Sequence, residues 1–328
     1  MQEPDAPPLN KTQRQRLAKQ QALGEKFNAV AQEAYEAFPK KLSHLVVIAD
    51  HMLAFAAPKV AGQMADMSYH HFDVGYPMSR DIDNMADHLA GLPRINGLAQ
   101  KDDVMAGMTV DSIALKTDGD REEAALWTLD HEIGHHILRN GHYKDKDHNN
   151  IAESAAEAYA ALRHLQRYKK NMSHINYLVN NISLNPLFPD MDRDHYTAGS
   201  IIRAVEAADK MGDDFYKMPL KDTAVLAAKI ADDTGLSDKK IAKIWRAYEG
   251  ARNIINAKDA DLSDACTEIF SVMKRHAHDA DIVHAGELCL NVDPLKALAD
   301  KLKPDWRTEL KYTKSHAARK SSVRTVAL

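Results

Sequence analysis

The sequence has few cysteines, few glycines and no long apolar run. The two cysteines, Cys266 and Cys289, cannot build a disulfide framework, and neither belongs to a CxxC pair, so we expect buried thiols in a reducing compartment. No apolar run approaches the roughly 20 residues of a membrane-spanning helix. The polar N-terminus has no apolar segment followed by a cleavage site, so we expect a cytoplasmic protein with no membrane span.

A strong charge of either sign is also missing. The net charge of −4 argues against nucleic-acid binding by the whole chain, and the 45% hydrophobic and 27% charged residues are typical of a globular protein. The C-terminus is the exception, because it is basic and we expect it to form a flexible tail. We therefore expect no nucleic acid as a partner.

The scarcity of glycine, with abundant Ala, Leu, Lys and Glu, favours helix. We expect helices over residues 23–38 and 42–57, each ending before a proline, and an irregular stretch over 171–196. Four further helices are expected between residues 197 and 278. The expected organisation is a disordered lead-in (1–20), a main domain (21–196), a helical subdomain (197–308) and a basic flexible tail (309–328).

One strand is expected, directly before the most informative helix. Val110, Ile113 and Leu115 are β-formers in a short run. The turn TDGD follows, and Asp120 with Glu123 three residues later resembles the capping box of a helix start.

That helix contains HEIGH, residues 131–135. His131 and His135 are one turn apart, so their rings share a face and can converge on one tetrahedral ion at about 2.0–2.1 Å. Glu132 projects about 100° round the helix, where a carboxylate can act as general base. Leu126, Leu129, Ile133 and Ile137 form the opposite, apolar stripe. A histidine-rich surface helix would also contain such a motif, so a third ligand is the test.

The third ligand is expected in ESAAEAYA, residues 153–160. Glu153 lies on a helix lined by alanines, and small residues allow close packing that brings a carboxylate to the ion. Glu157, one turn later, could accept a hydrogen bond from a ligand imidazole. Alternatively, Asn150 is a helix N-cap and Glu153 its capping-box partner.

These two segments together resemble the gluzincin metallopeptidases, which hold zinc with two histidines and a glutamate and have an ExxA[D/N]xxA-type segment downstream. The resemblance covers residues 127–160. It implies His131, His135 and Glu153 as Zn2+ ligands and Glu132 as general base, and it implies that a substrate backbone lies along the strand near Val110–Leu115. Position 157 departs from the pattern, because it is Glu where Asp or Asn is commoner.

Peptide hydrolysis also needs a donor for the oxyanion. His195 and Tyr196 are candidates, although core packing would equally explain Tyr196; His142 and Tyr143 compete with them. The expected fold is therefore α+β and predominantly α, zincin-like, with a short sheet before the metal helix and a helical C-terminal subdomain.

The expected function is zinc-dependent hydrolysis of peptide bonds in a protein or peptide substrate. Two alternatives stay open: a helical regulatory or binding protein with a structural or inactive zinc site, and a narrow-specificity effector or toxin protease. Glu132 argues against the first, because a structural site needs no base and is usually closed by four protein ligands.

Overall fold

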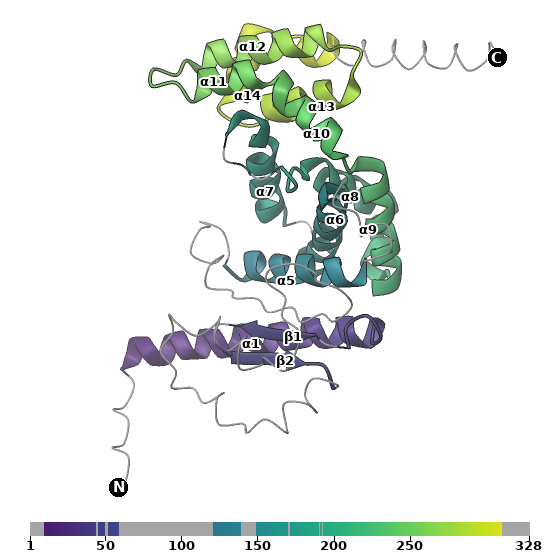
Figure 1. Ribbon diagram of the computed structural model, residues 1–328. Helices are drawn as coiled ribbons and strands as arrows, with labels where there is room; N and C mark the ends of the chain where they lie inside the picture. Colours follow the sequence, from purple (N-terminus) through teal and green to yellow (C-terminus); the bar gives the residue numbers. More distant parts are fainter. Residues whose placement is uncertain are drawn as a thin grey trace, which may run out of the picture. The chain divides into compact units, whose positions relative to one another are not determined.

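The computed structural model describes residues 10–43, 45–49, 52–58, 121–138, 149–169, 171–189, 191 and 193–309 (Figure 1). These residues are predominantly helical, as expected. The chain divides into two compact units. The first comprises residues 1–139, 159–171 and 208–228, and the second comprises 140–158, 172–207 and 229–328. The domain boundary expected between residues 196 and 197 falls inside the second unit.

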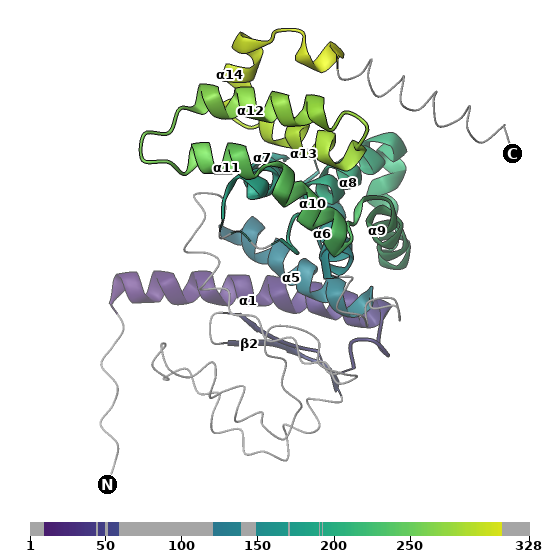
Figure 2. The ribbon, with the colours of Figure 1, turned by 45° about the horizontal axis from the view of Figure 1, so that its top comes forward.

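The first unit opens with a long helix beside a hairpin. Helix α1 (Lys11–Ala37) lies along strands β1 (Val46–Ala49) and β2 (Met52–Ala56), as both ribbon views show (Figure 2). The strands are antiparallel, pairing Val46 with Ala56 and Ala49 with Met52, and the register shifts between Val47 and Ile48. Phe27 and Ala31 of α1 are buried in the core of this unit.

Two expectations for this region are corrected. Residues 42–57 were expected to be a helix, but they contain the hairpin. The β-branched run Val46–Ile48 favours a strand, and the side chains of Val47 and Phe55, which pair across the hairpin, are buried in this unit. The lead-in expected over residues 1–20 is also wrong in part, since α1 begins at Lys11. The first turns of α1 are polar, and the buried side chains that the structure describes on it come later, beginning at Phe27. Further along the helix, the ring of Tyr35 contacts that of Phe55 in β2, with 6.0 Å between the ring centroids.

The two helices that carry the candidate site form where the sequence placed them. Helix α5 (Arg121–Ile137) begins directly after Asp120, and its stripe of Leu126, Leu129, Ile133 and Ile137 is buried. Helix α6 (Asn149–Tyr168) is the expected alanine-rich helix, and its alanines from Ala155 to Ala161 are buried. The expected strand over Val110–Leu115 lies outside the described residues.

The remaining elements are helical. Their bounds are α7 (Ser173–Ser183), η4 (Asn185–Leu187), α8 (Ala198–Met211), η5 (Gly212–Lys217), α9 (Leu220–Thr234), α10 (Asp238–Ala247), α11 (Glu249–Ile255), α12 (Leu262–Arg275), α13 (Ala280–Leu290) and α14 (Leu295–Leu302). The helices expected beyond residue 197 are confirmed. Helix α7 corrects the irregular stretch expected over 171–196: Pro186 and Pro189 follow this helix rather than interrupting it, and His174 and Ile175 are buried. None of the described helices is long and apolar enough to cross a bilayer.

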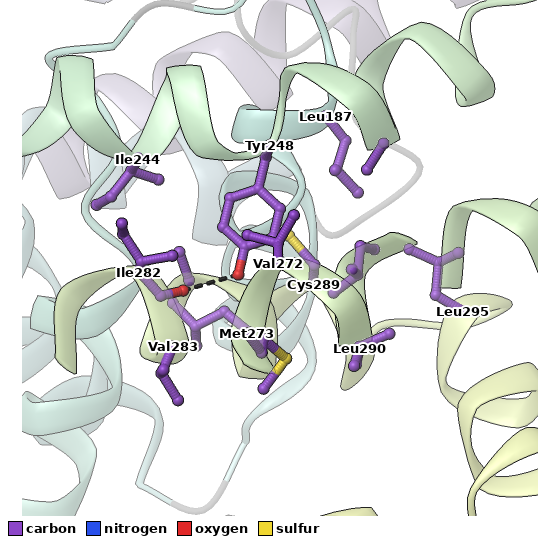
Figure 3. Packing of buried hydrophobic residues seen from close by; sticks show 14 of the residues in the cluster. Leu187, Ile244, Tyr248, Val272, Met273, Ile282, Val283, Cys289, Leu290 and Leu295 are labelled. Carbon is purple, nitrogen blue, oxygen red and sulfur yellow. Dashed lines mark hydrogen bonds between the residues drawn. The ribbon is translucent and has the colours of Figure 1, made fainter. Parts of the chain in front are cut away.

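The core of the second unit lies among α10 to α14. Figure 3 shows Tyr248 reaching across this core, where its hydroxyl donates a hydrogen bond to the carbonyl oxygen of Ile282 at 2.7 Å. Cys266 and Cys289 are both buried and free, as expected of two buried thiols. Burial raises the pKa of Cys266 to about 11 and that of Cys289 to about 12.

Candidate metal centre

The two histidines of HEIGH face each other on α5. The Nε2 atoms of His131 and His135 lie 3.0 Å apart, and the ring centroids are 4.7 Å apart with the rings nearly perpendicular. Two nitrogens bound to one tetrahedral zinc at about 2.0–2.1 Å would be roughly 3.4 Å apart. The pair is therefore close to the spacing that a shared ion requires.

Glu153 completes a group of three. His131, His135 and Glu153 each offer one ligand atom, and these atoms all lie within 4.8 Å of one another. Two imidazoles and a carboxylate are a donor set that zinc accepts, and three protein ligands leave a position for water or substrate. Within the described ranges, no other histidine, cysteine and carboxylate side chains are grouped in this way. The residues present thus fit a catalytic type of zinc site.

A buried ion-pair network, which sequence reasoning missed, holds α5 against the later half of α6. Asp130, the residue before His131, lies 2.6 Å from the guanidinium of Arg167 and 3.9 Å from that of Arg163. Arg163 also pairs with Glu33 of α1. Burial, reinforced by the charge of Asp130, raises the pKa of Tyr159 well above its usual range. Two arginines one turn apart on α6, with Asp130 on the helix before it, were the available signal in the sequence.

A second polar cluster joins the start of α5 to the end of α6. The side-chain amide of Asn171 donates to Glu123 at 2.6 Å, and His164 Nε2 lies 3.6 Å from the same carboxylate. Trp127 packs on His164, with ring centroids 5.6 Å apart. Together with the Asp130 network, this cluster fixes the rotation of α5, and therefore the direction in which His131 projects.

The structure places His195 beside Glu153, the candidate third ligand. Its Nε2 atom lies 3.2 Å from Oε2 of Glu153, and 45% of the imidazole side chain is exposed. Asn150 does not fit the capping explanation of Glu153, because it lies inside α6 and its side-chain amide donates to the carbonyl oxygens of Asp194 and Tyr196. The carboxylate of Glu153 therefore faces a histidine.

The remaining residues expected at the site lie in different surroundings. Tyr196 is a core residue: its ring packs edge-on against Trp245 at 5.4 Å, and burial raises the pKa of its hydroxyl well above the usual value. Packing, the alternative left open for Tyr196, is what the structure shows. Glu132 is half-buried on α5, and Glu157 is buried on α6, where its role beside a ligand imidazole stays a prediction. His142 and Tyr143 lie outside the described residues.

No family model, no curated protein and no solved structure matches this chain. The function is therefore argued from the residues and their arrangement.

Proposed function

We propose that the protein hydrolyses peptide bonds in a protein or peptide substrate with zinc as its cofactor. The observation that carries this proposal is the grouping of His131, His135 and Glu153, whose ligand atoms lie within 4.8 Å of one another. Hydrolysis also requires a general base, and Glu132 provides a carboxylate on the same helix, directly after the first histidine.

His131, His135 and Glu153 would hold the ion. When bound, zinc acts as a Lewis acid that lowers the pKa of water and polarises a carbonyl group. Glu132 would accept a proton from the attacking water and later donate it to the leaving amine, which is general base and then general acid catalysis. His195, with its exposed imidazole close to Glu153, remains our candidate for donating a hydrogen bond to the oxyanion.

The ligand set favours a catalytic site over a structural one. Structural zinc sites are closed by four protein ligands, whereas the group among the described residues has three. A structural site would also have no use for Glu132.

Metal content tests the site first. We expect about one zinc per chain in the purified wild type, measured by elemental analysis, and loss of that zinc in His135→Ala and in Glu153→Ala. Full retention in Glu153→Ala would show that the third ligand is misassigned. A wild type without zinc after incubation with zinc would contradict the proposal as a whole.

The chemistry is tested by Glu132→Gln. We expect this variant to keep its zinc but to lose about 10²- to 10⁴-fold of its hydrolysis of unfolded casein or of a peptide library, read by mass spectrometry of the products. Glu206→Gln, which changes an exposed glutamate on α8, is the matched control and should hydrolyse normally. Equal hydrolysis by Glu132→Gln and wild type would overturn the role of Glu132.

A further inference from the structure

Asn150 is a fully buried residue in the first turn of α6, one turn before Glu153. Its side-chain amide forms hydrogen bonds with three backbone groups of other segments. Its Nδ2 atom donates to the carbonyl oxygen of Asp194 at 2.7 Å and to that of Tyr196 at 3.2 Å. Its Oδ1 atom accepts from the backbone N–H of Leu236 at 2.8 Å and lies 3.5 Å from the hydroxyl of Ser154.

The two carbonyl groups that Asn150 binds stand on either side of His195. The backbone before and after this histidine is thus tied to α6, about one turn ahead of Glu153. His195 in turn lies 3.2 Å from Glu153, so a chain of contacts leads from the amide of Asn150 through this backbone segment to the carboxylate. The second unit contains all five residues of this arrangement, Asn150, Glu153, Asp194, His195 and Tyr196.

The loop between α9 and α10 packs against the first turn of α6. A Cβ atom on Gly235 would lie 2.8 Å from Ile151 Cγ1 and 2.8 Å from the carbonyl oxygen of Ala231, so only glycine allows this close approach to α6. The hydroxyls of Ser200 and Thr234 are 2.7 Å apart and join α8 to the end of α9. The partners of Asn150 are therefore held by packing as well.

We propose that Asn150 is a positioning residue that holds His195 against Glu153 and so orients this carboxylate for the metal. The part that concerns zinc rests on the proposed function. Only an amide can serve here, because the position requires two N–H donors and one acceptor on the same side chain. Polar contacts to a ligand carboxylate restrict its orientation, and the imidazole of His195 lies 3.2 Å from Oε2 of Glu153, which leaves the second oxygen of this carboxylate for the ion.

Zinc affinity gives the first test. We expect Asn150→Ala and His195→Ala each to weaken zinc binding by about 10-fold or more, in competition with a chromophoric chelator. Because Asn150 acts through His195, the two losses should not add: the double variant should bind zinc as tightly as whichever single variant has the lower affinity. Two independent losses that multiply in the double variant would overturn the proposal, as would unchanged affinity in Asn150→Ala.

Two further variants separate positioning from general loss of structure. Asn150→Asp keeps the acceptor for Leu236 but has no donors for the two carbonyl groups, so it should weaken zinc binding as Asn150→Ala does. Asn256→Ala is the matched control: this amide also donates to two carbonyl groups of the second unit, those of Leu187 and Arg252, and its loss should leave zinc affinity unchanged.

A second readout needs no metal. In long-range 1H–15N spectra of the metal-free protein, the His195 Nε2 resonance, assigned by its absence in His195→Ala, should shift in Glu153→Gln and equally in Asn150→Ala, but not in Asn256→Ala. A resonance that moves in Glu153→Gln and stays in place in Asn150→Ala would overturn the positioning role. This result is independent of whether the protein binds zinc or hydrolyses peptides, so it distinguishes failure of the inference from failure of the proposed function.

Discussion

Asp130 and Arg167 form an ion pair at 2.6 Å between α5 and α6, and only 1% of the Asp130 side chain is exposed. Asp130 directly precedes the candidate ligand His131, and Arg167 lies on the helix that contains Glu153. Burial would lower the pKa of Arg167, but the charge and hydrogen bond of Asp130 outweigh it and raise the pKa above the usual value. The guanidinium of Arg167 therefore stays charged, and the pair connects α5 to α6.

Removing one partner of this pair should be costly. We expect Asp130→Ala to lower the free energy of unfolding by about 3 kcal/mol, because Arg167 and Arg163 lose their buried counter-charge. Urea unfolding followed by circular dichroism measures the change. Arg203→Ala, which breaks the exposed pair with Glu206 on α8, should cost less than about 1 kcal/mol. Similar losses in both variants would contradict the importance of burial.

Metal removal should destabilise the wild type by an amount that grows with the logarithm of its zinc affinity. A ligand that binds only the folded state at about 1,000 times its Kd adds roughly 4 kcal/mol to the free energy of unfolding. We expect the melting temperature to fall when a chelator is added and to recover with zinc. His135→Ala should melt at the same temperature with and without zinc, and a response equal to that of the wild type would place the ion elsewhere.

Asp279 should make stability depend on pH at the acid end. Burial alone would raise its pKa, but the hydrogen bond and charge of Lys243 and the N–H groups of Asp281 and Ile282 outweigh it and lower the pKa below the usual value. A carboxyl group with a lowered pKa stabilises the fold above about pH 4, and this contribution is lost as the pH falls through the folded-state pKa.

Two substitutions at Asp279 distinguish the stability contributed by its charge from the stability contributed by its N-cap hydrogen bonds. Asp279→Asn keeps an N-cap for α13, so its stability difference from the wild type should be largest near pH 7 and shrink toward pH 2. Asp279→Ala also loses the cap and should cost about 1 kcal/mol more. Urea unfolding at both pH values measures this, and a difference for Asp279→Asn that does not change with pH would contradict the lowered pKa.

Gly286 of α13 should tolerate no side chain. A Cβ atom there would lie 2.4 Å from the hydroxyl of Tyr248 and 2.6 Å from Cγ of Met273. We expect Gly286→Ala to lower the free energy of unfolding by about 1–3 kcal/mol. Gly24→Ala is the control, because no described atom lies within 4 Å of a Cβ at that position in α1; it should be neutral or stabilise the helix by up to about 1 kcal/mol. Equal effects would contradict the tight packing at Gly286.

Short-range patterns in the sequence were enough for the elements of the candidate site. The spacing of His131 and His135, the apolar stripe beside them and the alanine-rich run of α6 each depend on neighbours within a few turns, so the two helices were predictable. The hairpin at 46–56 was missed for the opposite reason. Its residues also carry a pattern that a helix could accept, and contact with α1 decided for strands.

The sequence by itself indicated which residues could form the candidate site: two histidines on one helical face and Glu153 on a second helix as ligands, and a glutamate beside the histidines as general base. Tertiary structure alone decided their neighbours. It placed His195 on Glu153, put Tyr196 into the core against Trp245, and assigned Asn150 to two backbone carbonyls instead of a helix cap. Periodicity specifies the face of a helix on which a side chain lies, but partners distant in the sequence meet only when the apolar surfaces of the helices pack together.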